Sequence, residues 1–238
     1  MTPSLRHAGL ALITTLVFFT TAPTAFAQDT TSSKKDAAVS CANMNDTIDI
    51  NIKNPTGRVV YNTRVSRNDL VRIRQSRSRG VRQSNWKPLG LTLSDFTFQI
   101  GTSARLLPNA DNTYCAYPRA FDITIGYKGF KVYIDRRYGK GSCEYRAILE
   151  HENTHVSLYR SNMARNLPDL QRAVYSKARS IVPVIVNSPQ QGARYMQKQM
   201  ERKLKPLVAR LNRGAEIANA RIDTLISYKK VQARCRNW

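Results

Sequence analysis

Histidine is scarce in this chain: its 238 residues include three, and one of them, His7, lies in a segment that we expect to be removed. The mature chain therefore keeps only His151 and His155, which excludes any site that needs three histidines. Cysteine is also sparse, with four residues and no C-x-x-C spacing, so a metal site built from cysteines is not favoured. After the N-terminal segment, no apolar run approaches the roughly 20 residues of a membrane span. We therefore expect no transmembrane segment in the mature chain.

Acidic residues are few as well, because 16 Asp and Glu stand against 38 Lys and Arg, for a formal net charge of +22. Such an excess favours encounter with membrane headgroups, acidic polymers of a cell envelope or nucleic acid. The chain has no recognisable nucleic-acid-binding motif, so a specific nucleic-acid partner is not expected. We interpret the charge as favouring an anionic envelope surface, and as an indication of location rather than of chemistry.

Residues 1–27 have the pattern of a secretory signal peptide. Arg6 supplies a positive charge, Ala8–Thr20 is apolar and uncharged, and Ala25-Phe26-Ala27 fits the small-x-small cleavage rule. Cleavage would leave a polar, flexible leader over residues 28–44. The rest, residues 45–238, is expected to fold as a single domain of an exported bacterial protein, periplasmic or extracellular.

All four cysteines follow the expected cleavage site, so the exported chain meets an oxidising compartment and two disulfides are expected. Four cysteines allow three connectivities. We favour Cys41–Cys115 with Cys143–Cys235, because the second bond would join the start of one long helix to the end of the last helix.

The fold class is expected to be α+β, with a strand-rich part over residues 45–140 and a helical part over residues 141–238. In the first part, Asn68–Arg77 predicts a short helix and the basic stretch Ser76–Gln83 predicts a loop. The last two predicted strands are expected to form a hairpin across Lys128-Gly129. The predicted strands are Asp46–Ile52, Arg58–Val65, Leu91–Ile100, Phe121–Tyr127 and Phe130–Asp135.

The helical part opens at Ser142, a good N-cap residue, and Glu144 complements the positive end of the helix dipole. Prolines divide the remaining helical sequence. We expect one helix from Ser142 to about Asn166, a second from Pro168 to about Ser180, and then an apolar link over Ile181–Ser188. A long helical region follows Pro189, with Pro206 inside it as a new start or a kink. This region ends with a helix over Leu207–Gln232.

The first of these helices contains the pattern H-E-x-x-H, from His151 to His155. On a helix these two histidines lie one turn apart on one face, about 6 Å along the axis. That spacing allows both imidazoles to bind one Zn²⁺ at about 2.0–2.1 Å. Glu152 lies beside them, where its carboxylate can accept a proton from a water that the metal activates. The alternative is a surface helix with two histidines one turn apart by chance.

A catalytic zinc site usually has three protein ligands and one open position. The Gly and third His that follow this motif in metzincins are absent, because Leu158 and Ser161 stand at those positions. A carboxylate must therefore complete the site. The candidates are Asp169, Glu201, Glu216 and Asp223.

The expected Cys143–Cys235 bond ranks these candidates by their distance along the helices. His155 lies about 18 Å from the bond along its helix, and Asp223 lies about 18 Å from it along an unbroken last helix. Glu216 lies about 28 Å away, so it is the alternative third ligand and needs a shift of register.

The segment Cys143–Val156, together with Ile222-Asp223 and Tyr228 before the final cysteine, resembles the bacterial family of predicted secreted zinc-dependent proteases. The resemblance covers chiefly the C-terminal half. It implies a secreted zincin in which two histidines and a downstream carboxylate bind the metal, and in zincins a strand beside the motif helix can pair with an extended substrate. The family's downstream motif, Tyr-Asp followed by Thr and His-Gly, is incomplete here, which leaves Asp223 and Glu216 open as third ligands. Phe130–Asp135 is the candidate strand, with an ordinary hairpin as the alternative.

The sequence thus predicts an exported zinc metallopeptidase acting on a peptide or protein substrate, with Glu152 as general base and Zn²⁺ held by His151, His155 and Asp223. Tyr228 and Tyr159 are candidates to stabilise the oxyanion. Two alternatives stay open: a non-catalytic, basic envelope-binding protein, and a zinc amidase that acts on cell-wall peptides.

Overall fold

The computed structural model describes residues 41–42, 47–77 and 88–238. The predicted signal peptide, most of the predicted leader and residues 78–83 of the predicted basic loop lie outside the described residues. The predicted α+β class is confirmed, because strands dominate the first half and helices the second. No helix within the described ranges combines the length and the apolar content of a membrane span.

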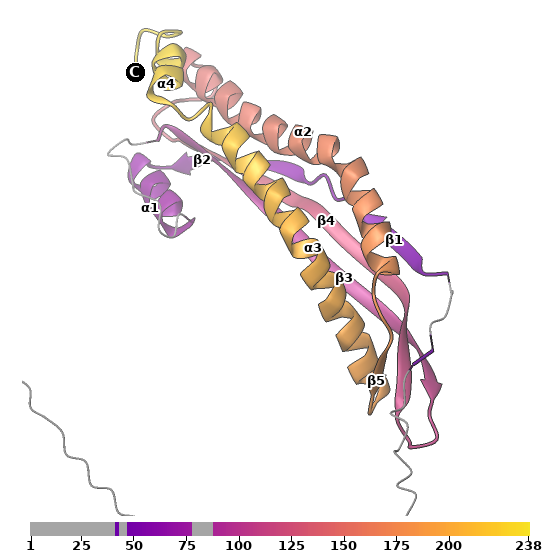
Figure 1. Cartoon of the computed structure of the whole chain (residues 1–238). Coiled ribbons are helices and arrows are strands. Elements are labelled where there is room, and N and C mark those ends of the chain that lie inside the picture. The colour runs from indigo at the N-terminus through magenta and orange to yellow at the C-terminus, as the bar shows by residue number, and fades with distance from the viewer. Residues whose placement is uncertain (1–40, 43–46, 78–87) are drawn as a thin grey trace, which may run out of the picture. The chain divides into compact units, whose positions relative to one another are not determined.

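A five-stranded sheet is built around the long strand β4, Tyr114–Asp135 (Figure 1). The antiparallel strand β3, Gly90–Pro108, pairs with one edge of β4 along nearly its whole length. The other edge pairs in turn with β5 (Val184–Val186), β1 (Asp49–Lys53) and β2 (Arg58–Val65), of which β1 and β2 are parallel to β4. Because both edges of β4 are occupied, the expectation that Phe130–Asp135 pairs with a substrate is wrong.

The predicted hairpin across Lys128-Gly129 is also wrong, because β4 continues through both residues. In the pairing with β3, Gly129 lies opposite Asp95 and Tyr127 lies opposite Phe96. Lys128 between them has no partner in β3, so it forms a β-bulge. The hairpin instead joins β3 to β4 through Asn109–Thr113, where the backbone N–H of Asn109 donates to the Thr113 carbonyl oxygen at 2.8 Å. Asn112 adopts a φ of 63°, a conformation that asparagine tolerates in turns.

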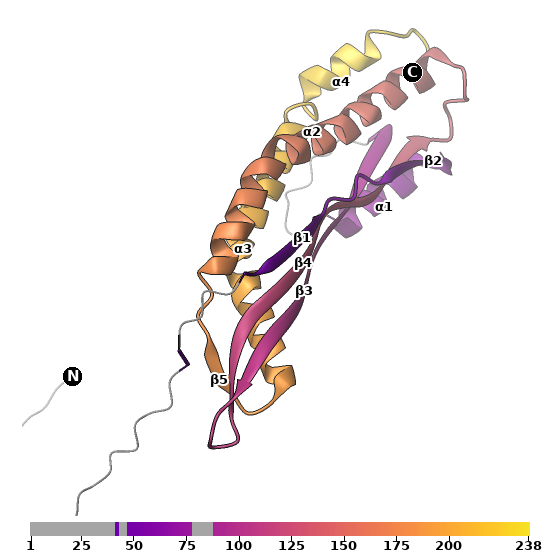
Figure 2. The ribbon, with the colours of Figure 1, turned by 90° about the vertical axis from the view of Figure 1, so that its right-hand side faces the viewer.

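Two long helices cover one face of the sheet (Figures 1 and 2). α2 (Cys143–Arg179) and α3 (Pro189–Ala220) lie side by side in opposite directions, and Asn162 Nδ2 of α2 donates to the Leu211 carbonyl oxygen of α3 at 3.0 Å. The short helix α1, Arg67–Arg77, confirms the predicted helix in the first half. The core between helices and sheet includes Phe121, Ile123, Ile125, Val132, Val174, Met196, Met200 and Leu204.

α2 is one continuous helix, so the prediction that it stops before Pro168 is wrong. Its N-terminus is as expected, because the Ser142 side chain accepts a hydrogen bond from the Tyr145 amide at 3.0 Å. A proline inside a helix removes a backbone hydrogen bond and costs about 3 kcal/mol. Met163 and Val174, on either side of this proline, are buried against the sheet, and we attribute the continuity of the helix to their packing.

α3 likewise passes through Pro206, which is therefore not a new helix start. The expected unbroken helix Leu207–Gln232 is wrong, because α3 ends at Ala220 and a separate helix, α4, spans Leu225–Gln232. The Thr224 side chain caps α4 by accepting a hydrogen bond from the Ser227 amide at 3.2 Å. The chain therefore turns between α3 and α4.

Both disulfides have the favoured connectivity. Cys41 bonds to Cys115, and Cys143 bonds to Cys235, with Cα–Cα distances of 5.5 and 5.8 Å. The second bond joins the first residue of α2 to the segment after α4, so it fixes the C-terminal segment beside the start of α2.

Because α2 runs through Pro168, replacing this proline with alanine should stabilise the protein. Alanine restores the amide donor and removes the clash of the ring with the preceding turn, so we expect the free energy of unfolding in urea to rise by about 1–3 kcal/mol. Pro189 is the control, because it lies in the first turn of α3, where proline is favoured. Pro189→Ala should leave the free energy of unfolding unchanged or lower it. A loss of stability in Pro168→Ala would contradict a continuous α2.

Candidate metal centre

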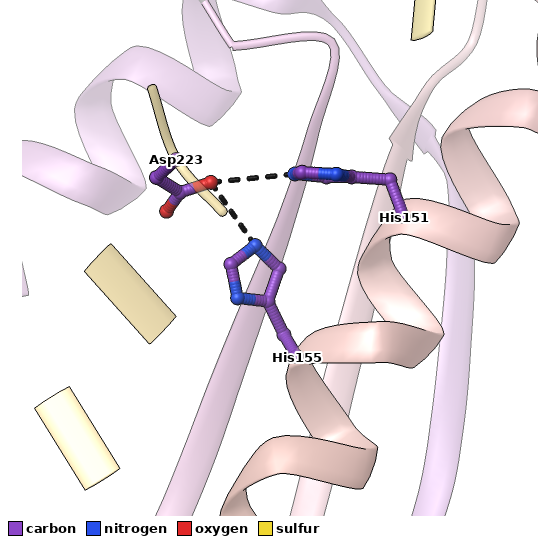
Figure 3. Close-up of side chains that lie close together, drawn as sticks. All are labelled: His151, His155 and Asp223. Atoms are coloured by element: carbon purple, nitrogen blue, oxygen red, sulfur yellow. Dashed lines mark hydrogen bonds and ion pairs between the residues drawn. The ribbon is translucent and has the colours of Figure 1, made fainter. Parts of the chain in front are cut away.

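The two histidines of the motif project from α2 toward the turn between α3 and α4 (Figure 3). Their side chains are almost fully buried, with 7% of His151 and 8% of His155 exposed, whereas 44% of the Asp223 side chain is exposed. Asp223 Oδ1 lies 3.3 Å from His151 Nε2 and 3.1 Å from His155 Nε2. Within the described part of the chain, this is the one group of three or more His, Cys, Asp or Glu residues whose ligand atoms all lie close enough together to hold a metal ion.

The ligand atoms of this group all lie within 4.8 Å of one another, and the two separations that involve Asp223 fit a tetrahedral metal site. Two donors that each lie about 2.1 Å from one ion at a tetrahedral angle are about 3.4 Å apart. The distances of 3.3 and 3.1 Å from the Asp223 oxygen to the two imidazole nitrogens are close to that value. Two imidazoles and one carboxylate also form a common ligand set for a metal site with an open fourth position. The group can therefore hold a metal ion.

Of the four carboxylates considered from the sequence, Asp223 is the one that joins the histidines. Asp169 forms an ion pair with Arg172 on α2, and Glu201 accepts a hydrogen bond from Gln197 on α3. Glu216 lies on the exposed face of α3 and does not belong to the group. The reason for the position of Asp223 differs from the expected one, because a turn rather than the rise of an unbroken helix brings it to the histidines.

Several contacts hold the C-terminal segment against α2. Besides the Cys143–Cys235 bond, Arg234 Nη2 donates to Glu150 Oε2 at 2.6 Å. The backbone N–H of Asn237 donates to Glu144 Oε1 at 3.3 Å. The carboxylate that completes the group thus belongs to a turn whose following segment is tied covalently and by hydrogen bonds to the helix that carries both histidines.

Asn219, on the buried face of α3, sets the orientation of His155. Its Nδ2 donates to the Ala215 carbonyl oxygen at 2.8 Å, so its Oδ1 faces His155 Nδ1, 2.8 Å away. His155 Nδ1 therefore carries a proton and donates a hydrogen bond to Asn219 Oδ1, and Nε2 is the ring nitrogen that faces Asp223. Sequence analysis missed Asn219, although its position in the series Leu211, Ala215, Asn219 places a polar residue in the buried register of the helix.

Glu152 is 2% exposed and lies against the start of β3. Thr92 Oγ1 donates to Glu152 Oε2 at 2.7 Å. Burial raises the pKa of Glu152, and this outweighs the opposing effects of His155 and Thr92. Such an environment is typical of a general base, and Thr92 is a further site residue that the sequence pattern did not indicate.

The charge state of Asp223 suits metal binding. Burial by itself would raise the pKa of Asp223, but the hydrogen bonds from His151 and His155 outweigh it and hold the pKa below its usual value. Asp223 is therefore ionised at neutral pH, as a carboxylate ligand must be.

An open pocket adjoins the group, and both predicted tyrosines line it. The Tyr228 hydroxyl donates to Asp223 Oδ1 at 3.1 Å, and its ring lies 5.1 Å from that of His151. Burial raises the pKa of Tyr159 and of Tyr228, so both hydroxyls keep their protons at neutral pH. The other residues that line the pocket include Arg74 of α1, which the sequence analysis did not identify, and Gly90, Leu91 and Thr92 of β3.

No protein-family model matches the chain, and no curated protein or solved structure matches it significantly. The resemblance to secreted zinc-dependent proteases therefore stays a prediction, and the function has to be argued from the site.

Asp223, rather than Glu216, should contribute to metal affinity. Asp223→Ala removes a ligand atom, so zinc affinity, measured by competition with a chelating dye, should fall strongly. The fall should exceed the roughly 10–100-fold that is typical when a residue that hydrogen-bonds to a ligand is removed. Glu216→Ala is the matched control on the same segment and should bind zinc within about threefold of the parent. Parental affinity in Asp223→Ala with a loss in Glu216→Ala would reverse the assignment.

Gly90 should be required because Glu152 occupies the space of a side chain there. A Cβ at position 90 would lie 2.6 Å from Glu152 Oε1 and 2.7 Å from Ile148 Cγ2. We expect Gly90→Ala to lower the free energy of unfolding in urea by about 1–3 kcal/mol. Gly101→Ala, in the same strand, is the control, because its Cβ would meet nothing closer than 3.4 Å.

A double-mutant cycle identifies the clashing group. Adding Glu152→Ala to Gly90→Ala should recover about 0.5 kcal/mol or more of the expected sum of the two losses. Strict additivity of the two changes would show that Glu152 does not fill this space.

Proposed function

We propose that the protein is an exported zinc metallopeptidase that hydrolyses peptide bonds. The observation that supports this most is the position of Glu152, a buried carboxylate that lines the same open pocket as His155 and Asp223. A buried base beside a three-ligand metal group is the arrangement that metal-assisted hydrolysis requires.

The ligand number favours a catalytic site over a structural one. Structural zinc sites usually have four protein ligands, whereas catalytic sites have three and keep one position open. Here the described residues supply three, and Asp223, with 44% of its side chain exposed, faces the pocket. The two disulfides are compatible with an exported protein.

A zinc ion in this group would lower the pKa of a water and polarise the scissile carbonyl. Glu152 takes the proton of the attacking water and passes it to the leaving amine, a role for which its raised pKa suits it. Thr92 holds the Glu152 carboxylate in place during this transfer. Tyr228 directs its single proton to Asp223 and so positions that ligand, which leaves Tyr159 as the candidate donor to the oxyanion.

The start of β3 is suited to bind a peptide. Within the described chain, β3 pairs along one edge only, with β4, and its residues Gly90, Leu91 and Thr92 line the pocket. An extended peptide can add to such an edge as a further strand. This arrangement favours peptide or protein substrates over small molecules.

Glu152→Gln should keep the metal and the fold but lose activity, because the amide cannot accept the proton. We expect unchanged zinc content by elemental analysis and a fall of about 10²–10⁴-fold in cleavage of labelled casein or of cell-wall peptides. Glu150→Gln is the matched control, because Glu150 lies on the same helix, is exposed and contacts Arg234 instead of the pocket. Its amide oxygen can still accept the hydrogen bond from Arg234, so that variant should keep parental activity.

The result separates the three candidate functions. Undiminished cleavage in Glu152→Gln would contradict this catalytic role. Absence of any cleavage by the zinc-loaded parent would favour a non-catalytic envelope-binding protein. Cleavage of wall peptides without cleavage of casein would favour the amidase.

A further inference from the structure

The outer face of α2 carries a row of arginines. Arg165, Arg172 and Arg179 recur every seven residues, about two helical turns, so they lie on one face. All three are exposed. The residues on the opposite side of the same turns, Met163, Leu170, Val174 and Ala178, are buried against the sheet.

The outer face of α3 carries a second row, with spacings of three or four residues that keep its first four members on one side of the helix. Its buried side is formed by Met196, Met200 and Leu204, so the row faces away from the sheet. The exposed cations of this row are Arg194, Lys198, Arg202, Lys205 and Arg213. Together with the three arginines of α2, they form what we call the basic helical face.

Few acidic residues neutralise this face. Residues 160–213 contain 12 Lys and Arg against two acidic residues, Asp169 and Glu201. Asp169 pairs with Arg172, and Glu201 accepts a hydrogen bond from Gln197. Among the residues that the structure describes, no carboxylate lies within ion-pair distance of Lys198, Arg202, Lys205 or Arg213. Eight of these 12 cations belong to the basic helical face, so this surface carries a clear excess of positive charge.

We propose that the basic helical face binds a linear acidic polysaccharide. On α3 the charges from Arg194 to Arg213 extend over about 28 Å, and two antiparallel helices present such rows side by side. This geometry suits a chain with repeated negative charges, which several cations contact at once. Repeated contacts of this kind are strongly weakened by salt.

The composition of the face argues against a bilayer and against single-stranded nucleic acid. Within the two helix segments 160–179 and 194–213, all of which the structure describes, Tyr175 is the one large apolar side chain that is strongly exposed. Helices that lie on a bilayer need an apolar face, and proteins that bind single strands stack several aromatic side chains on the bases. A polysaccharide held by charge needs neither.

The face and the metal group have no residue in common, so this inference does not depend on the proposed peptidase activity. The measurement therefore uses the full mature protein with Glu152→Gln, free of metal, so that no cleavage interferes. Polygalacturonate is the probe, because it is linear and carries one carboxylate per sugar, and neutral dextran is the control polymer.

The variant Lys198→Gln, Arg202→Gln, Lys205→Gln and Arg213→Gln removes four charges at exposed helical positions, where glutamine is a good helix former. The control variant Lys53→Gln, Arg119→Gln, Lys128→Gln and Lys131→Gln removes the same charge from exposed positions of the sheet. We expect the first variant to bind polygalacturonate at least about tenfold more weakly at low salt, with a shallower salt dependence. The control should stay within about threefold of the parent.

Two outcomes would overturn the proposal. Equal weakening in both variants would show that net charge, and not this face, determines binding. Tighter binding to phosphatidylglycerol vesicles or to a 30-nucleotide oligothymidylate than to polygalacturonate, at equal salt, would assign the face to a bilayer or to nucleic acid.

Discussion

The site depends on one carboxylate oxygen, Asp223 Oδ1, which lies within 3.3 Å of both imidazole Nε2 atoms of the motif. The motif helix supplies two donors by its own periodicity, but two donors do not make a catalytic metal site. The third donor comes from a turn, 68 residues after His155. Asp223 lies next to the two histidines because α3 packs along α2 and the Cys143–Cys235 bond holds the segment beyond α4. The distant parts of the fold therefore meet at this oxygen.

The burial of the site has an energetic cost that the local contacts reduce. Glu152 is 2% exposed, and an isolated buried carboxylate is strongly destabilising. Thr92 donates to it, Gly90 leaves room for it, and the imidazole of His155 lies near it. A bound cation would add further compensation, because the group already contains the ionised Asp223. The surroundings thus favour a carboxylate that is held in place yet retains a raised pKa, which is what a general base needs.

Sequence reasoning succeeded where a feature is local or where only a few arrangements are possible. The motif helix, its Ser142 cap and the disulfide pairing follow from spacing and from a short list of options. It failed where tertiary packing overrides a local signal, as at Pro168, where buried residues lie on both sides of the proline. It also misassigned Lys128-Gly129, because a bulge and a turn use similar residues and the choice depends on the partner strand. Thr92 lies 60 residues from Glu152, and no periodicity of the chain links the two.

The helix pair α2 and α3 keeps the core, the candidate metal group and the basic helical face apart. Each helix uses one side for the core, and the segments around His155 of α2 and Asn219 of α3 contribute to the candidate metal group. The opposite side contributes nothing to either, so charge can accumulate there without burying an ion or displacing a ligand. Exposed cations on that side keep their hydration, and the cost of placing them close together falls with salt. The positive charge of this chain is therefore compatible with a stable core and with a site that contains two carboxylates, because the helices keep the three regions on different faces.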